Sequence, residues 1–524
     1  MYNISILDCT LRDGGYCNQW RFGYNNIESI INGLEESGID IIECGYLTQK
    51  INTYDKDVTK YKMFSDLEDL IEGKKKNATY VAMINFGEYS PEDIPENKRG
   101  LIDGIRLAFH KKDVDAALEM SRVIKEKGYK VFVQPMLTLS YSDTEFIKLI
   151  SDVNLIEPYA VYIVDSFGSM NSNDLLRLKY LADNNLKPGI MVGFHSHNNL
   201  QLAYSNAQML ISMPSSRPLI LDSSIMGMGR GAGNLNSELI IQRFGNKYFI
   251  VPMLNIIDEI LGTFYKANYW GYSLANYLSA TYNLHPNYAN YLDNKDTLSF
   301  ESMNEIFSMM PDEKRLEYDK SYIERVYFEF MERHNSESFN IESIKQAMSG
   351  KKALIIAPGK SIDAYSDKIS ELAARDDIVS FTVNFNCPFF DSDFTFVGNI
   401  KRVREIKEYC RNGRSKLVTV SNVPISNPYA KLPYAELINE NEAVSDNSCL
   451  MLIKFLISIG VTEIYVAGMD GYSYNREENY SRYQTSFIKR SNEIDAINNG
   501  LSYMIKKLSD KAIINFVTPS LITK

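Results

Sequence analysis

The stretch "GIRLAFHKKDVDAALEMSRVIKEKGYKVFVQPM", residues 104–136, holds the repeating unit that decides the fold. Its first six and last seven residues are short apolar runs of the kind that form buried strands. Between them, residues 113–128 place apolar side chains at the spacing of an amphipathic helix and close on a glycine, as helices often do. A strand, a helix and a second strand in this order predict a βαβ unit with two parallel strands.

The same alternation runs through the first half of the chain. The predicted strands are ISILDCT (4–10), DIIECGY (40–46), ATYVAMI (78–84), GIRLAF (104–109), KVFVQPM (130–136), AVYIVDSF (160–167), MVGFHSH (191–197) and PLILDSSI (218–225). Eight βα units over about 240 residues are what a (β/α)8 TIM barrel requires. An open doubly wound sheet is the alternative, but eight regular units favour the barrel. Candidate site residues are then those at the carboxyl ends of the strands, where barrels carry their chemistry.

The composition is that of an ordinary globular protein of 524 residues. Apolar, aromatic and sulfur-containing residues make up 45% and charged residues 23%, which is enough for large cores. The net charge of −10 argues against nucleic-acid binding, because phosphate recognition needs clustered lysine and arginine. The sequence has no apolar run long enough to span a membrane and no basic, apolar leader at its start. Six scattered cysteines without zinc spacing or a disulfide framework indicate a cytoplasmic protein.

The patterns divide the chain into three sections. Residues 1–245 are the predicted barrel. Residues 246–345 change to helical patterns rich in Tyr and Asn, and we expect a helical extension that closes as a lid over the barrel mouth, followed by a linker. Residues 346–524 return to apolar runs, which predict a second, Rossmann-like α/β domain with mostly parallel, doubly wound strands.

Two of the five histidines stand two positions apart in "MVGFHSHNNL", residues 191–200. Strand side chains alternate between faces, so His195 and His197 point the same way, as a metal chelate or as a hydrogen-bonded core pair. Arg12 and Asp13 follow the first strand, either as a surface ion pair or as part of the barrel mouth. In a barrel the first and seventh strands both neighbour the eighth, which brings Asp13 to face the two histidines. One carboxylate and two neutral imidazoles suit Mn, Mg, Zn or Fe(II) as a Lewis acid, and Arg12 could hold the oxyanion of an enolised 2-keto acid.

Five motifs carry a family resemblance. They are LDCTLRDGG (7–15), IIECGY (41–46), IVDSFGSM (163–170), FHSHNN (194–199) and GMGRGAGN (227–234). In this order, over about residues 1–330, they resemble the DRE-TIM metallolyase superfamily, which includes 4-hydroxy-2-oxovalerate aldolase, hydroxymethylglutaryl-CoA lyase, isopropylmalate synthase and homocitrate synthase.

The resemblance implies a role for several residues of the barrel. It implies a metal bound by Asp13, His195, His197 and Asn234, with Mn²⁺ or Mg²⁺ expected and Zn²⁺ or Co²⁺ as alternatives, and an enolate stabilised by Arg12. Glu43, Asp165 and Ser166 match polar strand-end positions, with either a direct role in turnover or a role as barrel-lining groups that satisfy one another.

Within the superfamily the motifs favour the aldolase branch, which makes or breaks a carbon–carbon bond through a pyruvate-like enolate. Those aldolases have a histidine acid/base where this chain has Tyr16, and Tyr46 and His110 are other candidates for the proton transfer. A Claisen-type acyl-CoA synthase or lyase is the nearest alternative. Its members tend to continue the signature with DGEQ-like residues, whereas this chain continues GGYCNQW.

The third section carries a second resemblance. IIAPGKSIDAY (355–365) predicts a strand, a turn and a helix that starts near Ser361 and aims N–H groups at an anion. NFN (384–386), residues 446–473 and VTPSLI (517–522) resemble bacterial sialyltransferases that use CMP-activated sugars, and equally pterin-diphosphokinase-like domains. The resemblance implies a nucleotide or nucleotide-sugar site at Gly359, Ser361, Asn384, Asn386, Ser448, Asp470 and Ser520.

The sequence therefore predicts a two-part enzyme, a carbon–carbon lyase acting on a 2-keto acid and an aldehyde or sugar acceptor. The fusion suggests a sugar or nucleotide-sugar acceptor, as in surface-polysaccharide biosynthesis. A glycosyltransferase-like protein with a vestigial barrel is the alternative, although no histidine follows His334 to serve as its base, which would leave Asp470 or a tyrosine. The second domain could also serve only dimerisation, and we expect a homo-oligomer in either case.

Overall fold

The computed structural model describes residues 4–74, 77–215, 217–295, 298–333, 338–403, 406, 410, 412–423, 425, 427–482 and 491–523. The chain divides into two compact units. The first comprises Met1–Asn290 and Met310–Tyr318, and the second comprises Tyr291–Met309 and Asp319–Lys524. Each unit is built on its own parallel sheet.

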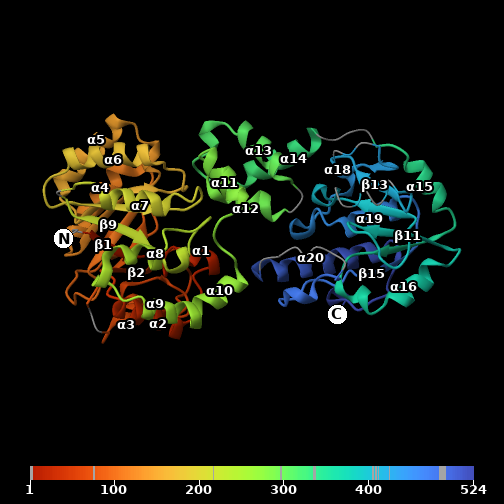
Figure 1. The fold of residues 1–524 in the computed structure, drawn as a ribbon, viewed down its shortest axis with the longest axis horizontal. Coiled ribbons are helices and arrows are strands. Elements are labelled where there is room, and N and C mark those ends of the chain that lie inside the picture. The colour runs from red at the N-terminus through yellow and green to blue at the C-terminus, as the bar shows by residue number, and fades with distance from the viewer. Residues whose placement is uncertain are drawn as a thin grey trace. The chain divides into compact units, whose positions relative to one another are not determined.

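The first unit is a closed parallel barrel (Figure 1). Among the described residues its eight barrel strands are β1 (Ile4–Asp8), β2 (Ile41–Leu47), β4 (Thr79–Asn85), β5 (Gly104–Phe109), β6 (Lys130–Pro135), β7 (Ala160–Asp165), β8 (Met191–Ser196) and β9 (Leu219–Ser223). Each pairs in parallel with its neighbours, and β1 pairs with both β9 and β2, which closes the ring. The two-residue strand β3 (Lys60–Tyr61) pairs with the end of β2. The predicted (β/α)8 barrel is confirmed.

Amphipathic helices surround the barrel, as Figure 1 shows. They are α2 (Tyr24–Glu36), α3 (Phe64–Ile71), α4 (Val114–Glu126), α5 (Asp143–Ile156), α6 (Ser172–Asn185) and α7 (Ala203–Ser212). In α2 the buried residues include Ile27, Ile30, Ile31 and Leu34, the spacing of one helix face. Helix α5 begins with a capping box in which Ser142 and Glu145 satisfy each other's backbone N–H groups, so the sequence itself fixes where this helix starts.

The strands carry two layers of apolar side chains. Those facing outward meet the helices in the main core, and those facing inward, such as Leu7, Phe132 and Tyr162, fill the barrel. Short helices α1 (Gly15–Asn18) and α8 (Ser237–Ile240) follow the first and last strands. The packed interior leaves the carboxyl ends of the strands as the place for a site.

Helices make up the section after the barrel, as the sequence predicts. They are α9 (Val251–Ile256), α10 (Gly262–Ala267), α11 (Leu274–Thr281), α12 (Pro286–Asn294), α13 (Phe300–Met309), α14 (Lys320–Arg333) and α15 (Ile341–Ala347). The boundary between the two units falls within this section, inside α12. Residues 334–337 of the expected linker lie outside the described residues, and the lid role stays a prediction.

The second unit is an α/β layer structure on a parallel sheet of order β14-β13-β12-β11-β10-β15-β16. Its strands are β10 (Lys352–Ile356), β11 (Ile378–Val383), β12 (Phe394–Val397), β13 (Lys416–Val420), β14 (Ala430–Leu432), β15 (Glu463–Ala467) and β16 (Ile513–Phe516). The helices include α16 (Ser366–Ala373), α18 (Tyr434–Leu437), α19 (Ser448–Ser458) and α20 (Ser491–Ser509). The strand order reverses direction between β10 and β15, the switch point of a doubly wound sheet, so the predicted parallel sheet is confirmed.

One local prediction in this unit is wrong. The expected helix near Ser361 is only a short 3₁₀ turn, Lys360–Asp363, and the α-helix begins at Ser366. The cause is a long-range contact, because the carboxylate of Asp470 accepts hydrogen bonds from both the backbone N–H and the hydroxyl of Ser361. The anion that this turn receives is therefore a side chain of the protein itself.

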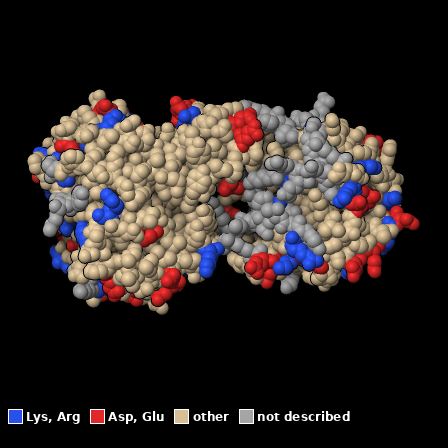
Figure 2. Space-filling view, viewed as in Figure 1, with Lys and Arg blue, Asp and Glu red and all other residues tan. Residues whose placement is uncertain are grey.

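Charged side chains of both signs are interspersed on the face shown in Figure 2. Within the part of the chain that the structure describes, we find no helix with the length and apolar character needed to cross a membrane.

Candidate metal centre at the barrel mouth

Three groups that can bind a metal ion converge where the barrel strands end. Asp13 follows β1, and His195 and His197 lie at the end of β8. One ligand atom from each lies within 4.8 Å of the others, and all three side chains are buried. The structure thus brings together the carboxylate and two imidazoles that the barrel geometry predicts.

Asn234 completes the wall beside these groups. Its loop pairs with the end of β8 through a bridge between His197 and Asn234. The Asn234 Nδ2 group donates to the Oδ2 atom of Asp13 over 2.8 Å. Gly229 leaves the space for this contact, since a Cβ atom there would lie 2.6 Å from the same Asp13 oxygen and 2.4 Å from Asn234 Nδ2. Asn234 therefore holds Asp13 in place, as well as offering its own Oδ1 atom.

The free lone pairs of the cluster fit a divalent cation. His195 Nδ1 is 2.9 Å from the carboxylate of Asp222, which leaves its Nε2 atom for a ligand. His197 Nδ1 and Asn234 Oδ1 are buried and have no hydrogen-bond partner among the described residues. Buried polar atoms without partners are rare in folded proteins, and an ion between these atoms would satisfy them.

The protonation states of Asp13 and His197 also favour a metal site. Burial raises the pKa of Asp13, but Arg12, His197 and His195 outweigh it and hold that pKa far below its usual value. Burial lowers the pKa of His197 to about 3, against the attraction of Asp13. At neutral pH the site therefore offers an ionised carboxylate and a neutral imidazole, the forms that bind metal ions.

A chain of alternating charges connects the two candidate ligands Asp13 and His195 through the barrel interior. Arg12 pairs with Asp13, and its Nε atom is 2.8 Å from Glu43. Glu43 is also 2.7 Å from the Nη1 atom of Arg106. Arg106 then pairs with Asp222, which binds His195. These side chains are almost fully buried, so each charge depends on its neighbours in the chain.

The Nη2 atom of Arg12 is left to donate to a ligand. Asp13 and Glu43 hold its Nη1 and Nε atoms, while the buried Nη2 atom has no hydrogen-bond partner among the described residues. Because the guanidinium is fixed by two carboxylates, it can meet a developing oxyanion without rearranging.

The proposed proton-transfer residues occupy different positions. Tyr16 is 42% exposed, and its hydroxyl is 3.5 Å from that of buried Tyr46. Burial raises the pKa of Tyr46 well above its usual value, so this phenol stays protonated. The Arg230 guanidinium carbon lies 5.6 Å from the centre of the Tyr16 ring. His110 follows β5, and burial lowers its pKa.

Asp165 and Ser166 organise a loop. The Asp165 carboxylate accepts the backbone N–H groups of Ser169 and Met170, and burial raises its pKa to about 7. The Ser166 hydroxyl accepts the N–H of Leu137. These contacts match the alternative in which strand-end polar groups satisfy the barrel itself, and a catalytic role for Asp165 stays a prediction.

Sequence reasoning missed three residues of the mouth. Arg106 and Asp222 are charged residues within apolar strand runs, a signal for a buried ion pair. His285 was also detectable, as one of only five histidines, set just before the proline that starts α12. The centre of its ring lies 5.7 Å from the ring centre of Phe167 and 5.8 Å from that of Tyr318. Burial, with Arg230, His110 and His197, lowers the pKa of His285 to about 3.

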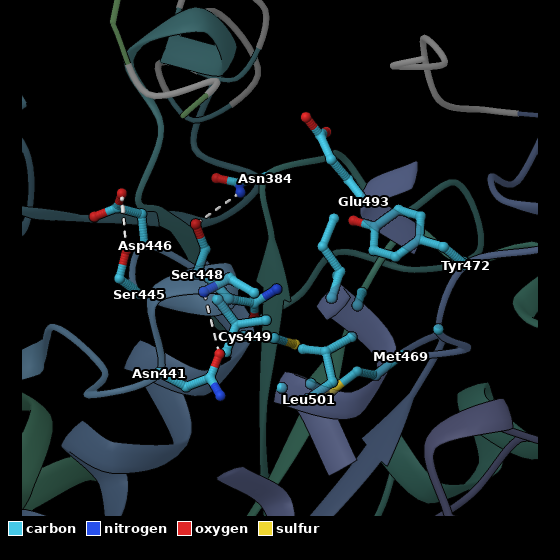
Figure 3. A pocket seen from close by; sticks show the side chains of 18 of the residues that line it. Asn384, Asn441, Ser445, Asp446, Ser448, Cys449, Met469, Tyr472, Glu493 and Leu501 are labelled. Atoms are coloured by element: carbon cyan, nitrogen blue, oxygen red, sulfur yellow. Dashed lines mark hydrogen bonds between the residues drawn. The ribbon is translucent and has the colours of Figure 1, made fainter. Parts of the chain in front are cut away.

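In the second unit the predicted nucleotide-site residues only partly converge. Gly359, Asn384, Ser448 and Asp470 line one cleft, and the amide of Asn384 donates to the Ser448 hydroxyl over 2.9 Å (Figure 3). Ser361 contacts Asp470, and the Ser520 hydroxyl donates to the backbone of Met469. Asn386 is outside the cleft lining. A nucleotide role for these residues stays a prediction.

Comparison with known proteins finds relatives of the barrel half of the chain. Residues 108–248 match the HMGL-like family. The N-terminal unit contains an HMGL-like domain. A 4-hydroxy-2-oxovalerate aldolase of Geobacillus genomosp. 3 is 28% identical to this chain over 246 residues, which cover 45% of this chain and 69% of that protein. The enzyme of the same name from Thermomicrobium roseum is 30% identical over 243 residues, with 45% and 65% covered.

The two aldolases each match 45% of this chain. The matched region spans about two thirds of each of these relatives, which are carbon–carbon lyases by name. A solved structure, the N-terminal domain of a candidate aldolase from Bacteroides vulgatus, is 29% identical and covers 57% of this chain and 98% of that domain, with a TM-score of 0.49.

Proposed function

We propose that the barrel is a divalent-metal-dependent aldolase or lyase that makes or breaks a carbon–carbon bond through the enolate of a pyruvate-like 2-keto acid. The observation that carries this proposal is the buried cluster of Asp13, His195 and His197 beside the unpartnered Nη2 atom of Arg12. The names of the relatives support the same reaction class.

Asp13, His195 and His197 would hold the ion, with Asn234 as a further ligand or as support for Asp13. We propose Mn²⁺ or Mg²⁺ as the ion. When bound, such an ion supplies Lewis-acid polarisation of the keto acid's oxygens. The alternating charges behind Arg12 and His195 keep both side chains in position while the substrate enters.

Arg12 is the proposed oxyanion holder. As the methyl proton of the keto acid leaves, negative charge gathers on the former carbonyl oxygen, and a fixed guanidinium donor stabilises that charge more than it stabilises the ground state. Glu43 acts through Arg12 by holding its Nε atom. Because donors of this kind contribute about 10²–10³ in rate, Arg12 should be essential for detectable turnover.

Tyr16 is the proposed proton carrier. It stands at the position where the related aldolases have a histidine, on α1 immediately after the signature motif. Its partial exposure lets its hydroxyl exchange protons with water, and the Arg230 guanidinium lies over its ring. This cation–ring contact holds the Tyr16 side chain in place beside the site.

The electrophile in the aldol direction is an aldehyde or ketone, and we propose a sugar or a nucleotide-linked sugar. The support is the second α/β unit on the same chain, with a cleft at its switch point. Fusion is an association and carries less weight than the geometry of the barrel.

Hydrogen–deuterium exchange at the pyruvate methyl group tests the proposed reaction without knowledge of the electrophile. Proton NMR would follow the methyl signal in D₂O with Mn²⁺ or Mg²⁺ present, and again after chelation. We expect metal-dependent exchange that Arg12→Ala abolishes while Mn²⁺ binding persists. The matched control is Arg177→Ala, which removes an arginine paired with Asp143 on the outer helices. Exchange that survives chelation, or that survives Arg12→Ala, would overturn the proposal.

A further inference from the structure

Arg230 is a cation at the barrel mouth without a carboxylate partner among the described residues. It lies between β9 and α8, in the motif GMGRGAGN that also holds Asn234. Its Nη2 atom donates to the backbone carbonyl of Ser166 over 2.9 Å, and its Nε atom is buried with no hydrogen-bond partner within the described ranges. Arg12 and Arg106, by contrast, are each held by two carboxylates. An arginine with a buried free donor and no counter-ion is suited to bind an anion.

The guanidinium of Arg230 lies beside the proposed metal ligands. The backbone N–H of Arg230 is 3.4 Å from the Oδ2 atom of Asp13, and its guanidinium carbon is 5.6 Å from the centre of the Tyr16 ring. Burial lowers the pKa of His197 and that of His285, and the charge of Arg230 adds to the effect on both rings. Arg230 therefore stands next to the ion site, where the second substrate of a bond-forming reaction has to come.

The loop before α12 adds a neutral donor to this part of the mouth, within the same compact unit. The backbone N–H of Asn287 donates to the Nδ1 atom of His285 over 3.2 Å, so the neutral ring carries its proton on Nε2. The rings of Phe167 and Tyr318 pack against this imidazole and fix its position. A charged donor from Arg230 and a neutral one from His285 both suit the oxygen atoms of an anion.

The carboxylates near Arg230 have other functions. Asp13 is a proposed metal ligand, and Glu317 pairs with Lys112 over 2.7 Å. Asp165 accepts backbone N–H groups of its own loop. The protein thus leaves the charge of Arg230 to be balanced by a ligand.

The charges of the loaded site call for two anionic groups. The chain of alternating charges from Asp13 to Asp222 contains three carboxylates and two guanidiniums, so it carries one net negative charge. A divalent ion on neutral imidazoles and the guanidinium of Arg230 together bring three positive charges. The 2-keto acid balances one of the two positive charges that remain. The other remains for an anionic group on the second substrate.

We propose that Arg230, with His285 beside it, binds an anionic group on the acceptor of the aldol reaction. The acceptor is then an aldehyde or ketone that carries a carboxylate or a phosphate, two groups that present similar oxygen atoms to a guanidinium. The new bond joins the former methyl carbon of the keto acid to the acceptor's carbonyl carbon, whose oxygen takes up the proton that the methyl group lost. This inference rests on the proposed function and states which acceptors the barrel selects.

Binding of unreactive anions to the full chain tests this subsite separately from catalysis. The probes are two matched pairs, 4-hydroxybutyrate with 1,4-butanediol and glycerol 3-phosphate with glycerol, titrated by saturation-transfer NMR with EDTA present. We expect the anion of at least one pair to bind about tenfold or more tightly than its neutral partner, because a hydrogen bond to a charged group is the stronger kind. The pair that responds distinguishes a carboxylate from a phosphate. A second series contains Mg²⁺ and pyruvate at the level that saturates methyl exchange, and we expect the anion still to bind.

Variants of Arg230 locate the binding. Arg230→Gln should weaken binding of the anion about tenfold or more, to the level of its neutral partner. Arg230→Lys keeps the charge but loses the planar fork, so its affinity should lie between those two. The matched control is Arg122→Gln, which removes an arginine paired with Glu119 on α4 and should bind the anion as the wild type does. Circular dichroism confirms that each variant is folded.

The reaction itself gives a second measurement. Pyruvate is condensed with succinic semialdehyde or butanal, and with glyceraldehyde 3-phosphate or glyceraldehyde. The quantity compared is the ratio of kcat/KM for the anionic and the neutral acceptor within one variant, because any general loss of enolate formation cancels in this ratio. We expect Arg230→Gln to lower the ratio about tenfold or more and Arg230→Lys to restore part of it.

Three results overturn the inference. They are equal binding of the anion and its neutral partner in both pairs, equal anion binding by Arg230→Gln and Arg122→Gln, and loss of the anion when Mg²⁺ and pyruvate are added, which would assign Arg230 to the keto acid. Pyruvate methyl exchange is measured on the same wild-type samples. Selective anion binding without exchange refutes the barrel proposal alone, and exchange without selective anion binding refutes this inference alone.

Discussion

Replacing Asp222 with asparagine should weaken divalent-metal binding at the barrel mouth about 10- to 100-fold. Asp222 is 1% exposed, and its Oδ2 atom lies 2.9 Å from His195 Nδ1. Burial opposes ionisation of Asp222, but Arg106 and His195 outweigh it and lower the pKa of this carboxyl group below its usual value. The ionised carboxylate accepts the Nδ1 proton of His195, which fixes the lone pair on Nε2 for the metal ion.

The expected loss of metal affinity arises because an asparagine side chain, unlike a carboxylate, can also donate a hydrogen bond to His195. An amide can turn its NH₂ group toward His195, which then accepts at Nδ1 and carries its proton on Nε2, where the metal ion should bind. Arg106 also loses one of its two buried carboxylate partners. The effect of 10- to 100-fold corresponds to about 1.4 to 2.7 kcal/mol of binding free energy.

The assay is a titration with Mn²⁺, in which electron paramagnetic resonance reports the free aquo ion. Asp183→Asn is the matched control, because Asp183 is also a carboxylate between two cations, Lys179 and Arg217, but lies on α6. His195→Ala gives the reference for complete loss of the ligand. Circular dichroism on each variant confirms that the barrel is folded.

One result would refute the reasoning. If Asp222→Asn binds Mn²⁺ within threefold of the wild type while His195→Ala does not bind it, the contact between Asp222 and His195 does not prepare the ligand. The charge chain from Asp13 to His195 would then serve barrel stability only, and Arg106→Lys should change the unfolding free energy without changing metal affinity.

Three further predictions address proton transfer and pH. Tyr16→Phe should lower the pyruvate-exchange rate about 100-fold or more with Mn²⁺ affinity unchanged, and an unaltered rate by NMR would exclude this phenol. Burial lowers the pKa of His285 to about 3, so this ring in the barrel mouth is neutral above pH 5, and we expect it to act as an N–H donor. His285→Gln, which keeps an N–H donor, should then retain a faster pyruvate-exchange rate by NMR than His285→Phe, and equal rates would exclude this role. Burial raises the pKa of Asp8 to about 6, so the stability gained from its neutral form is present below about pH 4 and lost as the pH rises through 6. Asp8→Asn should therefore gain up to about 3 kcal/mol relative to the wild type between pH 4 and 7 in urea unfolding, and a constant difference would contradict that pKa.

The barrel and the centre of its site were predictable because both depend on short-range patterns. Each strand run is apolar and is separated from the next by a helical period, and the closed ring then fixes which strand ends are neighbours. This is why the sequence alone predicts that Asp13 lies beside His195 and His197, although they are far apart in the chain. Arg12 followed from its position next to Asp13.

The charged residues that hold the site in place, Arg106 and Asp222, were less predictable. Their contacts depend on which side of the sheet each strand side chain points to. Arg106 and Asp222 lie within strand runs that were assigned as strands from their apolar residues alone. A charged residue inside a buried strand must find a partner, but the sequence does not say which of several carboxylates that partner is. The register of the barrel brings Arg106 to both Glu43 and Asp222, and this register appears only in the structure.

In the second unit the strands were predictable and the cleft only in part, since Gly359, Asn384, Ser448 and Asp470 line it but Ser361, Asn386 and Ser520 do not. The helix expected at Ser361 is replaced by a short turn because Asp470, 109 positions later, binds the N–H of Ser361. Local capping signals carry no information about such a partner. The cleft wall combines α12, α19 and α20 with three strand ends, so no single sequence window contains it.

The buried polar atoms at the barrel mouth argue against a vestigial barrel. Arg12 Nη2, His197 Nδ1 and Asn234 Oδ1 have no hydrogen-bond partner within the described part of the chain. Each buried polar atom without a partner costs about 1 to 3 kcal/mol, so a barrel kept only as a scaffold would be more stable with apolar residues at these positions. An ion and an anionic substrate that engaged the three atoms would offset this cost, as the proposed metal-dependent function requires.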